Sequence, residues 1–180
     1  MSIVESFKKI ITFFDEIRNE GIIEDYALIG GLALSAWIRP RTTKDIDLIV
    51  VASKDIKWKN VASIIETRLH KKVAVQKMTQ RTHIKEKLSF ILGQIEVDII
   101  STKGFDLAEE AIKNSVVAEV FGKHVKVVVP EYLILLKLLP LSSQDTIDIR
   151  ALVKKADRDR LKTLAQKHYL LLKLESVVKL

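Results

Sequence analysis

The sequence predicts an α/β fold of the α+β kind: a mixed sheet flanked by helices, followed by a helical C-terminal extension. Helical apolar patterns alternate with short apolar, strand-like runs from residue 5 to residue 129. Two pairs of such runs flank glycine-containing turns, which is typical of β-hairpins. After residue 130 the patterns are helical throughout. We therefore expect a core over residues 1–130 and a helical extension over residues 131–180 that packs on it.

The composition limits the classes of protein to which the chain can belong. Its 180 residues are 48% hydrophobic, which is enough for a sizeable core, and they contain no cysteine, which excludes disulfides and thiolate zinc sites. The four histidines are scattered, so we expect no zinc. The net charge of +7 favours polyanionic partners such as nucleic acid or a nucleoside triphosphate, although a thermophile's composition would raise the charge count equally. No apolar run reaches bilayer length and no signal-like segment opens the chain, so we expect no membrane partner and a cytoplasmic location.

In the first half, Ser2 is the expected N-cap of the first helix and Gly21 its stop, and Ser53 or Asp55 is the expected N-cap of the third. Pro40 ends the second helix. The expected elements are, in order, a helix over 5–19, a strand over 26–29, a helix over 32–38, a strand over 45–51 and a helix to about residue 70.

In the second half, Pro130 is expected at the start of a helix, Ser143 as the N-cap of the next helix, and Asp157 at the start of the last. The expected elements are a strand over 72–78, a loop over 79–85, a hairpin of 88–92 and 95–100 around Gly93-Gln94, a helix over 105–113, a hairpin of 116–121 and 125–129 around Gly122-Lys123, and helices over 131–139, 144–155 and 157 to about 168.

The glycine pair Gly30-Gly31 ends an apolar run and precedes a short apolar helix. Glycines leave the backbone amides accessible, and a helix N-terminus attracts anions, so this turn is a candidate phosphate cradle. Ser35, in the same helix, is a further candidate phosphate ligand. A dinucleotide-binding site is disfavoured, because the second and third glycines of the G-x-G-x-x-G motif are missing.

Asp45 and Asp47 open the next strand and, two residues apart, point to the same face. Neighbouring carboxylates repel each other unless a cation lies between them. Mg²⁺ prefers oxygen ligands and leaves positions open for phosphate oxygens. A simple turn followed by two solvated aspartates is the alternative, but the apolar run over 48–51 is unlike an exposed strand.

The glycine pair, the apolar helix and the Asp-x-Asp strand, in this order, resemble the nucleotidyltransferase superfamily with a DNA polymerase β-like core. Within it, the chain is most similar to the small AbiEii-type toxin nucleotidyltransferases, from about residue 26 to about residue 153. The resemblance implies a nucleotidyltransferase-like fold and Mg²⁺- or Mn²⁺-dependent transfer of a nucleoside monophosphate from an NTP to an acceptor hydroxyl, with release of pyrophosphate. It also implies RNA, such as tRNA ends, as acceptor, and an antitoxin as partner; antibiotic or protein hydroxyls serve elsewhere in the superfamily.

A two-metal phosphoryl-transfer site usually needs a third carboxylate, on a strand beside Asp45 and Asp47. Asp98 interrupts an otherwise apolar strand and matches the superfamily pattern of an acid between apolar residues. Glu96 shares its face by the period of two, but matches less well. A polar residue on a half-exposed strand is the alternative for both. We expect Asp45, Asp47 and Asp98 to be the metal-binding and catalytic residues.

The helix after Pro130-Glu131 contains Lys137 among leucines, where a lysine needs a partner or a path to solvent. The resemblance implies that Lys137 reaches the triphosphate or pairs with an acid near it. Asp148 matches the family's Lys-Asp-x-x-Asp-Ile helix and is expected to hold Lys137. Asp145, one turn earlier, compensates the helix dipole equally well, and Gln144 stands where the family commonly has lysine.

Two questions stay open at this level. Arg41 and Lys44, in the basic turn between the glycines and the aspartates, are candidates for steering triphosphate or acceptor, and a solvated surface explains them equally well. The rival to catalysis is a silent nucleotide-binding or toxin–antitoxin interaction module, against which the intact set of three carboxylates argues. The sequence identifies neither the acceptor nor the NTP.

Overall fold

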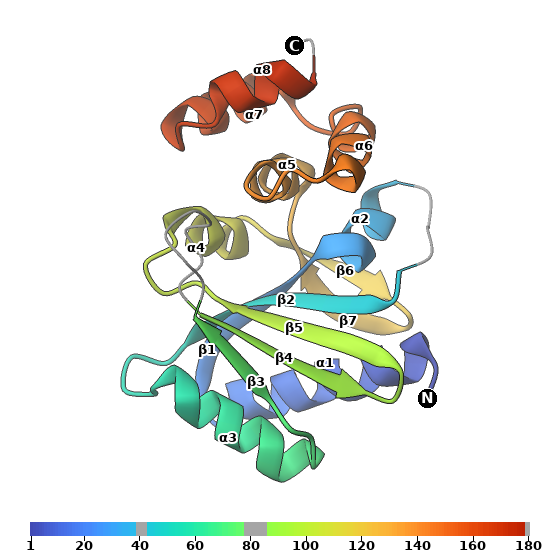
Figure 1. Cartoon of the computed structure of the whole chain (residues 1–180), viewed down its shortest axis with the longest axis vertical. Helices are drawn as coiled ribbons and strands as arrows, with labels where there is room; N and C mark the ends of the chain where they lie inside the picture. Colours follow the sequence, from blue (N-terminus) through green and yellow to red (C-terminus); the bar gives the residue numbers. More distant parts are fainter. Residues whose placement is uncertain (39–42, 78–85, 179–180) are drawn as a thin grey trace.

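A computed structural model describes residues 1–38, 43–77 and 86–178 of the chain. It contains a seven-stranded mixed sheet of order β3-β4-β5-β2-β1-β7-β6 with helices on both faces, which confirms the predicted fold class (Figure 1). The strands are β1 (Ile23–Ile29), β2 (Asp45–Ala52), β3 (Ala74–Lys77), β4 (Glu86–Leu92), β5 (Ile95–Ser101), β6 (Val116–Val120) and β7 (Lys123–Val127). The helices are α1 (Ile3–Asn19), α2 (Gly30–Trp37), α3 (Trp58–Leu69), α4 (Asp106–Lys113), α5 (Pro130–Leu138), α6 (Ser143–Leu152), α7 (Arg158–Lys167) and α8 (Leu171–Val177).

The strand pairing places the acidic strand β2 at the centre of the sheet. β2 runs antiparallel to β1 on one side and parallel to β5 on the other. The β4–β5 and β6–β7 hairpins extend the sheet outward. The alternate residues Ile46, Leu48 and Val50 of β2 are fully buried on one face, so Asp45 and Asp47 point to the other face.

The helices form two layers around the sheet. In Figure 1, α1 and α3 lie along one face, and α2 and α4 lie on the other. α5 packs against both α2 and α4, and α6, α7 and α8 pack around α5 (Figure 1). The helices that follow the sheet are therefore anchored on the face to which the aspartates point. The division into a core over 1–130 and an extension over 131–180 stays a prediction.

The first helix shows why these residues adopt this structure. Ser2 Oγ accepts a hydrogen bond from the amide of Glu5 at 3.2 Å, and the Glu5 carboxylate accepts one from the Ser2 amide at 2.7 Å. This capping box satisfies amides that the first turn leaves unpaired, and it confirms Ser2 as the N-cap. Phe7 and Phe14, at helical spacing, are fully buried against the sheet side of the core.

Two predicted N-caps were wrong. α3 begins at Trp58, with Lys57 in the N-cap position and no side-chain cap, because Ser53 donates its hydroxyl hydrogen bond to the Gly21 carbonyl oxygen at 2.6 Å instead. α6 is capped by Ser142 and not by Ser143. Asp145 is the third helical residue after Ser142, and its carboxylate accepts a hydrogen bond from the Ser142 amide. This reciprocal capping box requires that the N-cap lie three residues before the acid, which Ser142 does and Ser143 does not.

Two further boundaries differ from the prediction. The β6–β7 turn is Phe121-Gly122, one residue earlier than expected, and both residues have positive φ, as a tight hairpin turn requires. The helix predicted from Asp157 to about residue 168 corresponds to α7, and a further helix that was not predicted, α8, follows Tyr169, which adopts a left-handed φ of 59°. The loop predicted over 79–85 lies outside the described residues. No helix in the described ranges is both long and apolar enough to cross a membrane.

Candidate active site

The turn from β1 into α2 places a glycine directly against an aspartate. The helix begins at Gly30, two residues before the predicted start, and Gly30 has a φ of +64°. A Cβ atom on Gly30 would lie 1.9 Å from Oδ2 and 2.9 Å from Cβ of Asp47. Glycine is therefore required here both for the left-handed backbone and for the close approach of the helix to β2.

The start of α2 has the properties of an anion site. The N-cap residue, Ile29, has a hydrocarbon side chain that cannot accept hydrogen bonds from the first-turn amides of Gly30 and Gly31. Gly31 is buried in that turn. Ser35 Oγ donates to the Gly31 carbonyl oxygen at 3.0 Å, so its proton is used within the helix and an oxygen lone pair is left for a ligand.

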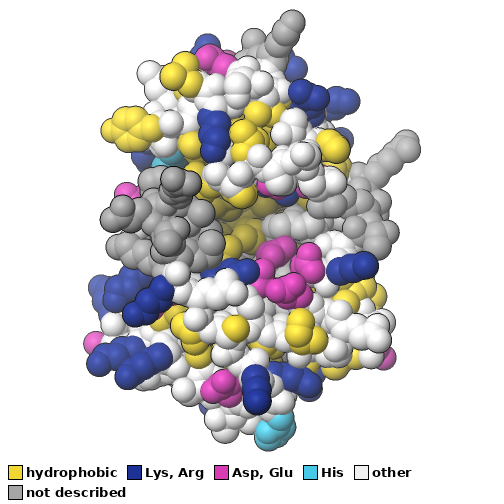
Figure 2. Space-filling view, viewed as in Figure 1, with side chains coloured by type: hydrophobic (Ala, Val, Ile, Leu, Met, Phe, Trp, Pro, Cys, Tyr) yellow, Lys and Arg dark blue, Asp and Glu magenta, His cyan; other side chains and the backbone are white. Residues whose placement is uncertain are grey.

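The parallel pairing of β2 with β5 brings the predicted carboxylates together. Asp47 lies opposite Asp98 in the register, and Asp45 lies opposite Glu96. The period of two places all four on one face of the sheet. Asp47 and Asp98 are half-buried, whereas Asp45 and Glu96 are exposed. Figure 2 shows acidic side chains gathered over the middle of the sheet, below a hollow under the C-terminal helices.

The electrostatics of this cluster are those of crowded anions. Burial, reinforced by the negative charges of Asp98 and Asp45, raises the pKa of Asp47 from 3.8 to about 7. The positive charges of Lys137 and Lys87 act in the opposite direction on the same pKa. Both lysines therefore contribute positive potential at the carboxylate cluster.

Sequence reasoning missed two side chains that hold Asp98. Lys87 Nζ lies 2.7 Å from Asp98 Oδ2, and Ser89 Oγ donates to Asp98 Oδ1 at 2.6 Å. Both residues come from β4, where they alternate on the same face as Asp98 on β5. The signal was available, because counting back from the predicted Gly93-Gln94 turn places Ser89 opposite Asp98.

Lys137 is held at the site by two carboxylates of the next helix. Its Nζ lies 2.8 Å from Asp148 Oδ2 and 3.0 Å from Asp145 Oδ1, and its side chain is only 13% exposed. Asp148 is the predicted partner, and it also accepts from Gln144 Nε2 at 3.0 Å. Burial opposes ionisation of Asp145, but hydrogen bonds from Ser142 and Lys137 hold its pKa below the ordinary value.

The remaining sequence candidates lie outside this cluster or outside the described residues. Lys44 is exposed next to Asp45, and Arg41 is not among the described residues. His168 lies 3.2 Å from Glu110 Oε2, in the contact between α4 and the end of α7.

A divalent cation fits the chemistry of the cluster, because three carboxylates lie on one face of two neighbouring strands, and the negative charges of Asp98 and Asp45 raise the pKa of Asp47. Within the described ranges, no three carboxylate, histidine or cysteine side chains already converge as a metal site. Each oxygen of Asp98 accepts a hydrogen bond, one from Lys87 and one from Ser89.

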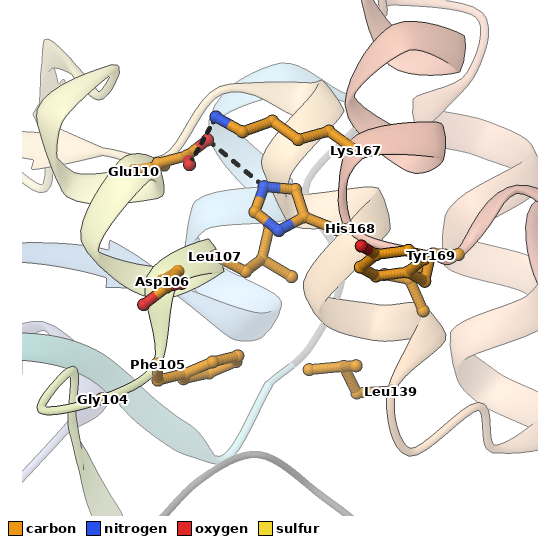
Figure 3. A pocket seen from close by; sticks show the side chains of 10 residues that line it. Gly104, Phe105, Asp106, Leu107, Glu110, Leu139, Lys167, His168 and Tyr169 are labelled. Atoms are coloured by element: carbon orange, nitrogen blue, oxygen red, sulfur yellow. Dashed lines mark hydrogen bonds and ion pairs between the residues drawn. The ribbon is translucent and has the colours of Figure 1, made fainter.

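A second hollow lies between α4 and the α7–α8 turn. Figure 3 shows this cavity of about 300 Å³, with Phe105 and Leu139 at its base. At its rim the Glu110 carboxylate pairs with Lys167 at 2.7 Å and with His168 (Figure 3). These pairs join α4 to α7. They account for the polar side chains of the hollow as contacts between helices.

Comparisons with known proteins agree with the fold. The family model described as "Nucleotidyl transferase AbiEii toxin, Type IV TA system" matches residues 13–171. A search of curated proteins gave no match.

Solved structures share the fold at low sequence identity. An antigenic nucleotidyltransferase-like protein from Paracoccidioides brasiliensis is 18% identical, with a TM-score of 0.57 over 96% of this chain and 94% of that one. The antibiotic-resistance factor ANT(2″)-Ia is 15% identical, with a TM-score of 0.58 over 97% of this chain and 98% of that one. The lincosamide antibiotic adenylyltransferase LnuA, with lincomycin bound, is 14% identical, with a TM-score of 0.51 over 83% of this chain and 97% of that one.

Proposed function

The chain belongs to the AbiEii nucleotidyltransferase toxin family, and on that premise we propose that it transfers a nucleoside monophosphate from an NTP to an acceptor hydroxyl and releases pyrophosphate. The observation that carries the proposal is the in-register placement of Asp47 beside Asp98, with the glycine turn of α2 against Asp47. This juxtaposition puts a carboxylate cluster and an anion-binding helix start on the same face of the sheet.

In this proposal Asp45, Asp47 and Asp98 hold Mg²⁺ or Mn²⁺. When bound, the metal neutralises charge on the phosphates and makes the acceptor hydroxyl more acidic. Asp98 takes the proton of the acceptor hydroxyl as its oxygen attacks the α-phosphorus, and the bond from that phosphorus to the bridging oxygen of pyrophosphate breaks.

Three further residues would bind the triphosphate, and Ser35 would support one of them. The amides of Gly30 and Gly31 donate to phosphate oxygens at the start of α2, and the Ser35 hydroxyl supports that turn. Lys137, held by Asp148, supplies positive charge to the leaving pyrophosphate. Because two aspartates fix its ammonium group, little side-chain entropy is lost when the phosphate arrives.

RNA, such as tRNA ends, is the acceptor that we propose first, because the net charge of +7 attracts a polyanion. An antitoxin is the proposed protein partner, in keeping with the toxin description of the family. Small hydroxylated antibiotics are the alternative acceptors, since two neighbours in fold are an antibiotic-resistance factor and an antibiotic adenylyltransferase.

One observation favours a second candidate function. Asp98 already has a partner on each oxygen, as expected in a member that binds nucleotide or partner protein without catalysis. Such a module would bind NTP with Mg²⁺ and release no pyrophosphate with any acceptor.

The deciding experiment incubates the protein with each α-labelled NTP and Mg²⁺ or Mn²⁺, in separate reactions with total RNA, total protein and an aminoglycoside. We expect label in RNA together with release of pyrophosphate, and no label with Asp47→Asn. Label in protein or in the antibiotic would show that RNA is not the acceptor, and it would still support nucleotide transfer. Tight NTP binding without pyrophosphate in every reaction would establish the silent module instead.

A further inference from the structure

Lys87 forms a close, partly buried ion pair with the third carboxylate of the site. Its Nζ lies 2.7 Å from Asp98 Oδ2, and the two side chains are 19% and 18% exposed. Ser89 holds the other carboxylate oxygen at 2.6 Å. Asp98 thus has both oxygens engaged before any ligand arrives.

The two lysines near the carboxylates differ in how they are held. Lys137 has two carboxylate partners, Asp145 and Asp148, on α6, away from the sheet. Lys87 has, in the described part of the chain, one carboxylate partner, and that partner is Asp98. Its ammonium group therefore neutralises a residue of the site itself.

A divalent cation and the Lys87 ammonium group compete for the Asp98 carboxylate. Mg²⁺ binds carboxylate oxygens at about 2.0–2.1 Å and tolerates little distortion of its ligand shell. An ammonium group at hydrogen-bond distance from Oδ2 would lie close to that ion, and the two positive charges repel each other. The cation therefore binds Asp98 less favourably as long as Lys87 stays at this distance.

We propose that Lys87 is an internal counter-cation that occupies Asp98 in the metal-free protein and thereby sets the affinity of the carboxylate cluster for divalent cations. This inference rests on the proposed function, because it takes Asp45, Asp47 and Asp98 as the metal-binding set. Lys87 is a positioning residue: it acts on the metal through Asp98. The competition keeps the full set of carboxylates from closing around a metal until the substrate supplies further ligands.

The test measures binding of Mn²⁺ alone, from the electron paramagnetic resonance signal of the free ion, in four forms of the full chain. These are the wild type, Lys87→Met, Asp98→Asn and the double variant. We expect Lys87→Met to bind Mn²⁺ roughly tenfold or more tightly than the wild type, because the ion pair no longer has to break. In the Asp98→Asn background, the same substitution should change the affinity little.

The matched control is Lys126→Met. Lys126 forms a similar Lys–Asp pair with Asp25 across β7 and β1, outside the carboxylate cluster, and its removal should leave Mn²⁺ affinity unchanged. Lys87→Gln, which keeps a polar neutral side chain, replaces Lys87→Met if melting curves show that the methionine variant is unfolded.

The outcomes separate this inference from the proposed function. Unchanged or weaker Mn²⁺ binding in Lys87→Met, with the wild type binding normally, would overturn the role of Lys87 alone. An equal gain in the Asp98→Asn background would also overturn it, since the effect would then be one of overall charge. Folded wild type and folded Lys87→Met that both fail to bind Mn²⁺, with or without ATP, would remove the metal site and the proposed function together.

Discussion

Gly30→Ala separates the requirement for glycine backbone from the requirement for space beside Asp47. A Cβ at Gly30 would lie 1.9 Å from Asp47 Oδ2, and ordinary contact begins at 3.4 Å, so the carboxylate would have to retreat by about 1.5 Å. Rotation of the side chain alone is not enough, because Asp47 Cβ would be only 2.9 Å away. Displacement of a catalytic group by about 1 Å can cost a hundredfold in rate.

Gly21→Ala is the matched control. Gly21 has a similar φ of +73°, but a Cβ there would meet nothing within 4 Å. Both variants carry the cost of a left-handed alanine, about 1 kcal/mol, which lowers the melting temperature of a chain of this size by roughly 2–4 °C. Only Gly30→Ala should also lose transfer activity, by roughly a hundredfold or more. The assays are thermal melting and pyrophosphate release. Equal activity in both variants would refute the packing of Gly30 on Asp47.

Three further predictions concern the carboxylates and Lys137. Folding raises the pKa of Asp47 from 3.8 to about 7, so between about pH 4 and pH 7 the folded protein holds a proton on Asp47 that the unfolded chain has lost. The Asp47 carboxylate therefore destabilises the fold fully above pH 7 and not at all below about pH 4. Metal-free Asp47→Asn should therefore be more stable than wild type at pH 8, by up to about 4 kcal/mol, and melting in EDTA should show the gap closing towards pH 4; a constant gap would contradict this. Lys137→Met leaves Asp145 and Asp148 without their shared cation, so we expect about 3 kcal/mol of destabilisation in urea titrations and weaker NTP binding; unchanged values of both would remove Lys137 from the site. Asp98→Asn should lose turnover and keep NTP affinity, whereas Glu96→Gln, on an exposed residue opposite Asp45, should change neither; the reverse pattern in steady-state kinetics would exchange their roles.

The parts of the fold that were predictable are those that local patterns determine. The Ser2 N-cap and the Pro130 helix start depend on residues within one turn, and both occur as predicted. The caps of α3 and α6 were wrong because several polar residues compete there. Tertiary contacts such as the hydrogen bond from Ser53 to Gly21 decide between them. α8 was not predicted, and no glycine or proline marks the left-handed Tyr169 that precedes it.

The candidate site also has features that local patterns predict and features that depend on the tertiary structure. Period-two alternation predicts that Asp45 and Asp47 share a face, but that Asp98 lies opposite Asp47 depends on the sheet order, which a single sequence does not contain. The pattern also does not distinguish the two glycines. Gly30 is the one in contact with Asp47, because it has the positive φ and α2 crosses β2 at that point.

Lys87 shows how a residue of the site escapes sequence reasoning. It lies just before the strand predicted over 88–92 and after a polar, basic stretch, where a lysine is ordinarily a solvated surface residue, and no family pattern points to it. The hairpin turn at Gly93-Gln94 nevertheless fixes the register of β4 on β5, and with it which side chains of β4 flank Asp98. An acid in an apolar strand needs a partner. The nearest cross-strand neighbours on the same face are the first places to look for one. Here they supply the Lys87 ammonium group that, in our proposal, competes with a divalent cation.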